Sequence, residues 1–203
     1  AAAAAMGGFL FGYDSAVING AVSAIQDTFR VGSTVIGFTV AAALIGSAVG
    51  AAIAGALADR IGRIRVMQLA AVLFAASAVG SALPFTVWDL AWWRVVGGVA
   101  IGIASVIAPT YIAEVSPPAF RGRLASLQQL AIVLGIATSQ LVNYGLAAAV
   151  GGSALHRLGP LQAWQWMLGI EVLPAATYFV LTLVIPESPR HLVRIGRDAR
   201  ARR

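Results

Sequence analysis

Three ionisable side chains lie inside otherwise uncharged, apolar stretches of this sequence: Asp14, Arg94 and Glu171. If these stretches cross a bilayer, a charge near its centre costs at least about 2.5–3.5 kcal/mol, so each residue should face a partner or a wet cavity. At 1.5 Å per helical residue, Asp14 lies roughly 15 Å from either end of its stretch and Arg94 roughly 6 Å inside its own. The long arginine side chain can cover much of the remaining depth, so the two residues can meet if their helices are adjacent.

An Asp14–Arg94 pair has two readings. The first is a static salt bridge that fixes helix packing. The second is a proton switch, because an arginine partner favours the ionised carboxylate while burial favours the protonated one. Protonation of Asp14 would then release Arg94 and change which packing is preferred. The residues alone leave both readings open.

A polar stripe marks the fifth apolar stretch. At 100° per residue, Ser126, Gln129, Gln140 and Asn143 fall within about a third of the helical wheel. Amides both donate and accept hydrogen bonds without carrying a charge, which suits a neutral, hydroxyl-rich ligand. Hydrogen bonds between helices are the alternative use of such amides. Phe11, one turn before Asp14, offers an aromatic face that suits a sugar ring.

Other kinds of site are not expected. The chain has no cysteine, and its two histidines, His156 and His191, are far apart, so no metal site and no cofactor is predicted. No nucleophile–base pair suggests an enzyme. The net charge of +6 comes from arginines clustered between apolar stretches, so nucleic acid is not an expected partner.

The elements that position these residues are predicted to be membrane helices. Hydrophobic residues make up 59% of the chain and charged residues 11%, whereas a soluble domain carries roughly a quarter charged residues. The sequence predicts an all-α membrane protein with a six-helix bundle over residues 1–185. The expected spans are 4–25, 33–58, 66–87, 90–113, 124–149 and 162–185. Each is close to the ~20 residues that cross a bilayer, and residues 186–203 are a tail or the start of a linker.

Arginine placement predicts the orientation. Most arginines lie between the second and third spans, between the fourth and fifth, and in the tail. The positive-inside rule then places both termini of this multi-pass protein in the cytoplasm. Five tryptophans fall near the opposite interface, where an aromatic belt is expected: Trp88, Trp92, Trp93, Trp164 and Trp166. The chain opens on Ala1 with no preceding basic region, so we expect a start within the first helix and no signal peptide.

Small residues spaced four apart recur in three spans. Such pairs let helix backbones approach closely in lipid, where apolar burial does not drive association. The pairs are Gly8 with Gly12, Gly46 with Gly50, and Gly98 with Gly102. They predict a tightly packed bundle and carry no information about a ligand.

Several motifs then resemble one family. These are GYDSAVING at residues 12–20, GALADRIGRIR at 55–65, YIAEVSPPAFRG at 111–122 and PESPR at 186–190. Arg94, Gly97 and Gly98 also match the start of the family's fourth helix. Together, and in this order, they resemble the sugar porter family of the major facilitator superfamily over nearly the whole chain.

The resemblance implies roles for particular residues. Asp14 would be the proton-coupling carboxylate and Arg94 its partner. Phe11, Gln129 and Asn143 would line the sugar site. A charge network would close the cytoplasmic gate, and its members would be Asp59, Arg60, Arg63, Glu114, Arg121, Glu187 and Arg190.

The resemblance also implies a function and a partner. The family fold has twelve helices in two halves, with substrate bound between them, and this chain corresponds to the N-terminal half. We expect proton-coupled symport of a monosaccharide across the cell membrane, with a C-terminal half or a second six-helix unit as partner and lipid around both. Facilitated diffusion without protons, and a membrane module that binds or senses sugar without transporting it, remain alternatives.

Overall fold

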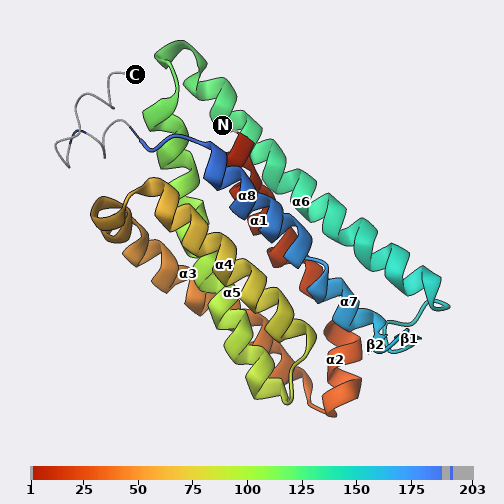
Figure 1. Cartoon of the computed structure of the whole chain (residues 1–203). Coiled ribbons are helices and arrows are strands. Elements are labelled where there is room, and N and C mark those ends of the chain that lie inside the picture. Colours follow the sequence, from red (N-terminus) through yellow and green to blue (C-terminus); the bar gives the residue numbers. More distant parts are fainter. Residues whose placement is uncertain (1, 189–192, 194–203) are drawn as a thin grey trace.

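Long helices run side by side in the computed structural model, which describes residues 2–188 and 193 (Figure 1). The described chain is almost entirely helical, as the sequence predicts. Its elements in order are α1 (Ala2–Val17), the 3-10 turn η1 (Ile18–Gly20), α2 (Val22–Phe29), α3 (Ser33–Ile61), α4 (Arg63–Ala82), α5 (Val87–Val115), η2 (Pro118–Phe120), α6 (Arg121–Ala149), β1 (Arg157–Leu158), β2 (Leu161–Gln162), α7 (Ala163–Gly169) and α8 (Val172–Val184). The two strands form a small antiparallel hairpin.

Five helical stretches in the described part of the chain are long and apolar enough to cross a membrane. They are Ser33–Ile61, Arg63–Ala82, Val87–Val115, Gly122–Ala149 and Ala163–Val184. The region expected to form the first span, 4–25, is divided among α1, η1 and α2. The last stretch is also interrupted, because α7 ends at Gly169 and α8 begins at Val172. Breaks therefore occur both in the region expected to form the first span, which is not among these five stretches, and in the last of the five.

The connection between α4 and α5 departs from the boundaries expected from sequence. Helix α4 ends at Ala82 rather than near residue 87. Leu83 precedes Pro84, and a residue before proline is disfavoured in helical geometry. Helix α5 begins at Val87 because the Thr86 side chain accepts a hydrogen bond from the backbone N–H of Asp89 at 3.1 Å, which caps the new helix.

Glycines bring α3 and α5 into backbone contact. A Cβ placed on Gly46 would lie 2.1 Å from Val95 O, and one on Gly98 would lie 2.1 Å from Ala43 O. Gly50 and Gly102 face the partner backbone in the same way, with distances of 2.3 and 2.1 Å to the nearest carbonyl oxygen. The small-residue pairs of these two helices therefore form their interface, since any side chain would force the backbones apart.

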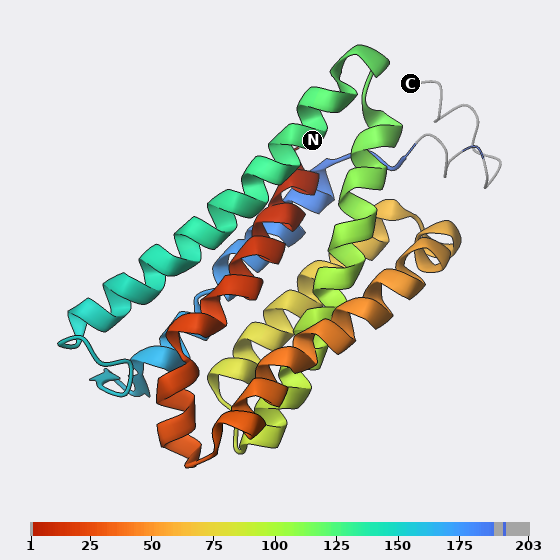
Figure 2. The same cartoon turned by 180° about the vertical axis from the view of Figure 1, so that it is seen from behind.

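Glycines also bring α1 and α6 into backbone contact. A Cβ on Gly12 would lie 2.0 Å from Ile132 O, and one on Gly135 would lie 2.1 Å from Phe9 O. Figure 2 shows the resulting arrangement, with α3, α4 and α5 on one side and α1, α6, α7 and α8 on the other. Contacts of α1 with α5 and of α4 with α8 join the two groups, so Asp14 on α1 lies at the seam between them.

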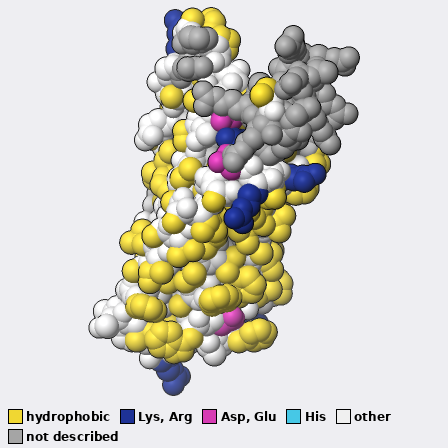
Figure 3. All heavy atoms as spheres, turned by 90° about the vertical axis from the view of Figure 1, so that its left-hand side faces the viewer, with side chains coloured by type: hydrophobic (Ala, Val, Ile, Leu, Met, Phe, Trp, Pro, Cys, Tyr) yellow, Lys and Arg dark blue, Asp and Glu magenta, His cyan; other side chains and the backbone are white. Residues whose placement is uncertain are grey.

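The two ends of the bundle differ from its middle. The start of α1, the α3–α4 turn, the α5–α6 connection and the end of α8 lie at one end, at the upper left of Figure 1. Helix α2, the α4–α5 connection and the β1–β2 hairpin lie at the other end. Figure 3 shows hydrophobic side chains covering the middle of one face, with charged side chains gathered toward its ends, as a bilayer requires.

The glycine interface makes a testable prediction. Gly98→Ala should destabilise the protein by about 1–3 kcal/mol, because the added methyl group overpacks a contact already at backbone distance. The measurement is the thermal unfolding temperature in detergent. The matched control is Gly145→Ala on α6, where a Cβ meets nothing within 4 Å. Equal unfolding temperatures for the two variants would contradict a backbone contact at Gly98.

Candidate functional site

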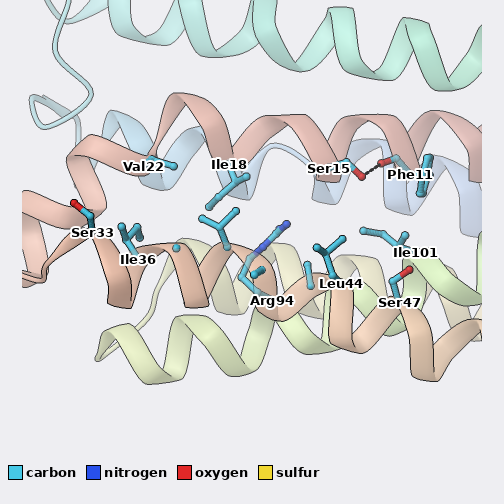
Figure 4. A pocket seen from close by; sticks show the side chains of 14 residues that line it. Phe11, Ser15, Ile18, Val22, Ser33, Ile36, Leu44, Ser47, Arg94 and Ile101 are labelled. Atoms are coloured by element: carbon cyan, nitrogen blue, oxygen red, sulfur yellow. Dashed lines mark hydrogen bonds between the residues drawn. The ribbon is translucent and has the colours of Figure 1, made fainter.

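A buried ion pair joins α1 to α5. Arg94 Nη1 donates to Asp14 Oδ1 at 2.6 Å, and Arg94 Nη2 lies 3.4 Å from the Asp14 backbone oxygen. Both residues are almost fully buried, Asp14 at 1% and Arg94 at 2% exposure. Figure 4 shows Arg94 extending from α5 toward α1. The structure thus brings together the two charges that the sequence analysis paired.

Helix α4 also lies close to this site, because the α5 residue between them, Gly97, has no side chain. A Cβ on Gly97 would lie 2.5 Å from Ser77 Oγ and 3.6 Å from Asp14 Oδ2. Ser77 Oγ in turn donates to the Trp93 backbone oxygen at 2.8 Å. The absence of a side chain at Gly97 therefore lets α4, α5 and α1 converge on the carboxylate.

Glu171 is a third charged member that the sequence analysis left without a role. It lies in the break between α7 and α8 and is 3% exposed. Its carboxyl group interacts electrostatically with both Asp14 and Arg94. Asp14 Oδ2 and Glu171 Oε1 are buried and have no hydrogen-bond partner among the described residues. The sequence marks Glu171 as an acidic residue at membrane depth. It does not reveal the neighbours of Glu171, because Asp14 and Arg94 lie on two other helices.

The formal charges of this group do not balance when every member is ionised, because two carboxylates then face one guanidinium. With one proton, the two carboxyl groups and Arg94 sum to zero charge. A buried group that is neutral overall avoids the large cost of an uncompensated charge. One proton on either carboxyl group would therefore balance the charges of this site.

Two cavities lie along α1, and one of them reaches Arg94. One, of about 360 Å³, lies between α1, α5 and α6 and is lined by Phe11, Gln128, Gln129 and Ser105 among others. The other, of about 490 Å³, lies between α1, α3 and α5, and its lining includes Phe11 and Arg94 (Figure 4). Phe11 therefore borders both cavities, and the structure places Phe11 and Gln129 in one wall.

Asn143 is placed elsewhere. It is 5% exposed and lines neither of these cavities. Its Nδ2 donates to the Val17 backbone oxygen at 2.9 Å, across the α1–α6 contact. The polar stripe on α6 thus divides into an exposed amide beside a cavity, Gln129, and a buried amide between helices, Asn143.

A second charged cluster lies at the end of the bundle that contains the α3–α4 turn. Arg63 donates to Glu114 through Nε and Nη2, both at 3.1 Å. Its Nη1 lies 3.1 Å from Asp59 Oδ1. Ser188 Oγ donates to Glu114. This cluster ties α3 and α4 to the C-terminal end of α5 and to the segment after α8.

Glu187 completes the cluster by capping α4. Its carboxylate accepts from the backbone N–H of Arg63 at 3.0 Å and of Ile64 at 3.3 Å, where a helix start has unpaired donors and partial positive charge. Arg60, also expected in this network, is exposed. Arg190 and the side chain of Arg121 lie outside the described residues.

Comparison with known proteins places this geometry in a family. A family model described as "Sugar (and other) transporter" matches residues 1–203. The chain is 56% identical to a glucose transport protein of Synechocystis and 41% identical to an arabinose-proton symporter of Bacillus subtilis, each over 98% of this chain and 42% of the relative. The chain thus spans about two fifths of the length of these curated relatives.

A solved structure is also similar to this chain. It is the proton:xylose symporter XylE, a major facilitator superfamily protein, bound to 6-bromo-6-deoxy-D-glucose. The TM-score is 0.91 at 36% identity, over 98% of this chain and 46% of that chain. XylE is from Escherichia coli.

The Glu187 cap makes a prediction about stability. Glu187→Ala should lower the free energy of unfolding by about 0.5–2 kcal/mol, the usual effect of removing a helix cap. Thermal unfolding of the complete protein measures the change. Asp27→Ala is the control, because it removes an exposed carboxylate from α2 at the other end of the bundle. If both variants unfold at the same temperature as the wild type, Glu187 does not cap α4.

Proposed function

The chain belongs to the sugar porter family of the major facilitator superfamily, and on that premise we propose that it is one half of a proton-coupled monosaccharide transporter. The observation that carries the proposal is the buried group of Asp14, Arg94 and Glu171. The other half would be a C-terminal six-helix unit or a second unit of this kind, with the sugar bound between halves and exposed alternately to each side. A transporter is also what the relatives' names describe, rather than an enzyme.

Proton coupling follows from the charge balance of this group. With one shared proton, Arg94 keeps Asp14 as its carboxylate partner. A second proton, placed on Asp14, leaves Arg94 unpaired and gives the group a net positive charge. The protein then gains by rearranging so that Arg94 meets water or another acceptor, which is a change in conformational preference driven by proton binding.

The sugar contacts of this half would come from the cavity between α1, α5 and α6. Gln129 supplies an exposed amide that can donate and accept hydrogen bonds. Phe11 supplies an aromatic face and lies one turn before Asp14 on α1. Because Phe11 borders both cavities, sugar bound against it lies near the proton site, which is the arrangement that coupling requires.

The cytoplasmic side is assigned to the end with the Arg63 cluster. Arg60, Arg63, Arg65 and Arg123 lie there, and the positive-inside rule favours the cytoplasm for such loops. The start of α1 and the end of α8 share this end, so both termini would be cytoplasmic in the cell membrane. The inner gate would use Arg63, Asp59, Glu114 and Glu187, with Arg60, Arg121 and Arg190 as further members.

Facilitated diffusion is the second candidate. The relative at 56% identity is named a glucose transport protein, without mention of a proton. In that case the Asp14–Arg94 pair serves packing alone. The buried carboxyl pair favours the symporter, because a structural salt bridge needs one carboxylate and this site has two.

Substitution of the carboxylate separates these candidates. Asp14→Asn keeps the shape but cannot release a proton, so it resembles the protonated state permanently. In vesicles, the complete transporter should still exchange labelled glucose, xylose or arabinose, yet lose accumulation driven by a proton gradient. Asp27→Asn, an exposed carboxylate on α2, should leave both activities unchanged.

A packing role for Asp14 gives a different result. Removal of one partner would leave Arg94 buried and unpaired, with a loss of about 3–5 kcal/mol and failure of folding, binding and exchange together. Proton-driven accumulation that survives in Asp14→Asn would overturn the coupling assignment.

The sugar site makes its own prediction. Gln129→Ala should weaken sugar binding by roughly 1–3 kcal/mol, the effect of leaving hydrogen-bonding groups unpaired, or about 5- to 150-fold in affinity. Binding to the complete transporter is measured by calorimetry. Gln140→Ala, an exposed amide nearer the other end of α6, is the control. Unchanged affinity in Gln129→Ala would show that this amide does not contact the sugar.

A further inference from the structure

The first membrane segment is broken one turn beyond Asp14. Helix α1 ends at Val17, and the backbone N–H of Ala21 donates to Ile18 O at 2.9 Å, three residues back instead of the four of an α-helix. Helix α2 then starts at Val22 and takes a different direction from α1 (Figure 2). Such a 3-10 interruption inside a helix is a common place for a hinge.

Asn143 of α6 lies directly against this break. Its Nδ2 donates to Val17 O, the carbonyl at which α1 ends. A Cβ on Gly20 would lie 2.4 Å from Asn143 Nδ2 and 2.6 Å from its Cγ. The break and the amide therefore fit each other on both sides, through a hydrogen bond at Val17 and a contact at Gly20 that admits only glycine.

The two segments that meet at the break have different neighbours. On the α1 side, Arg94 bonds to the Asp14 side chain and lies 3.4 Å from its backbone oxygen, so the last turn of α1 belongs to the proton site. On the α2 side, Phe29 packs edge-on against Trp164, with ring centroids 6.3 Å apart. Val22 faces the cavity between α1 and α3 (Figure 4). Helix α2 thus forms part of the outer wall of that cavity.

We propose that Asn143 is a positioning residue that holds η1, and through it the start of α2, against the proton-binding turn of α1. While Asn143 holds Val17 and Gly20, a shift of α1 that follows proton binding at Asp14 carries α2 with it and changes the outer wall of the cavity. Without that tie, α2 moves independently of Asp14. This inference rests on the proposed function and gives Asn143 a role other than direct contact with the sugar.

Two variants break the tie from opposite sides. Asn143→Leu keeps a similar size but removes the donor, and Gly20→Ala keeps Asn143 but inserts a methyl group between them. Gln140→Leu is the matched control, since it removes an exposed amide one turn earlier on α6. Each variant is made in the complete transporter, with Val22→Cys as the labelling site. This chain has no cysteine of its own, so only cysteines in the remaining part need to be removed.

The first measurement is the rate at which a water-soluble maleimide labels Val22→Cys, at low and at high proton concentration. In the otherwise unchanged transporter this rate should depend on proton concentration. Asn143→Leu and Gly20→Ala should each reduce that dependence by about fivefold or more, the scale of one coupling interaction. The second measurement is sugar exchange against proton-driven accumulation in vesicles. Both variants should keep exchange and lose most accumulation, while Gln140→Leu keeps both.

The outcomes separate this inference from the proposed function. If the unmodified transporter exchanges sugar but never accumulates it with a proton gradient, the proposed function fails, while the labelling assay still tests the tie. If accumulation is proton-driven and Gly20→Ala matches the control in both assays, the inference fails. Loss of exchange and thermal stability together in both variants also overturns it, because Asn143 is then needed only for packing.

Discussion

The buried pair of Asp14 and Arg94 is the interaction on which the rest of this structure depends. A carboxylate and a guanidinium at membrane depth are tolerated if they pair with each other or face a wet cavity. The 2.6 Å contact meets that condition, with both side chains almost fully buried. The pair requires α1 and α5 to lie together at one depth and in one rotation, which constrains both groups of helices.

Glycine contacts between helices allow the close helix packing that this ion pair needs. Gly12 and Gly135 bring α1 and α6 to backbone contact, and Gly46 and Gly98 do the same for α3 and α5. Lipid gives no hydrophobic drive for helices to associate, so close packing must hold them. Each glycine interface stabilises one rigid group of helices, and the charged group occupies the seam between the two. A shift between the two groups would therefore change the contacts of Asp14, Arg94 and Glu171.

Helix α5 connects the two charged clusters of the molecule. It carries Arg94 near one end and Glu114 near the other, roughly 30 Å apart at 1.5 Å per residue. Arg94 bonds to α1 within the membrane, whereas Glu114 bonds to Arg63 at the start of α4. Helix α5 is thus held by an ion pair at each cluster, with Pro109 between them. It connects the Asp14–Arg94 pair to the Arg63 cluster directly.

Much of this protein follows from its sequence by itself. The uncharged stretches require membrane helices, and the cost of a buried charge requires a partner for Asp14, for which Arg94 lies at a suitable depth. Tertiary structure alone decided the rest, because helical periodicity says which face a residue occupies but not which helix lies opposite. Glu171 joins the Asp14–Arg94 group only because the α7–α8 break brings it near α1. Asn143 shares a face with Gln129 on the helical wheel, yet it lies far enough along α6 to meet the break after Val17 instead of the cavity.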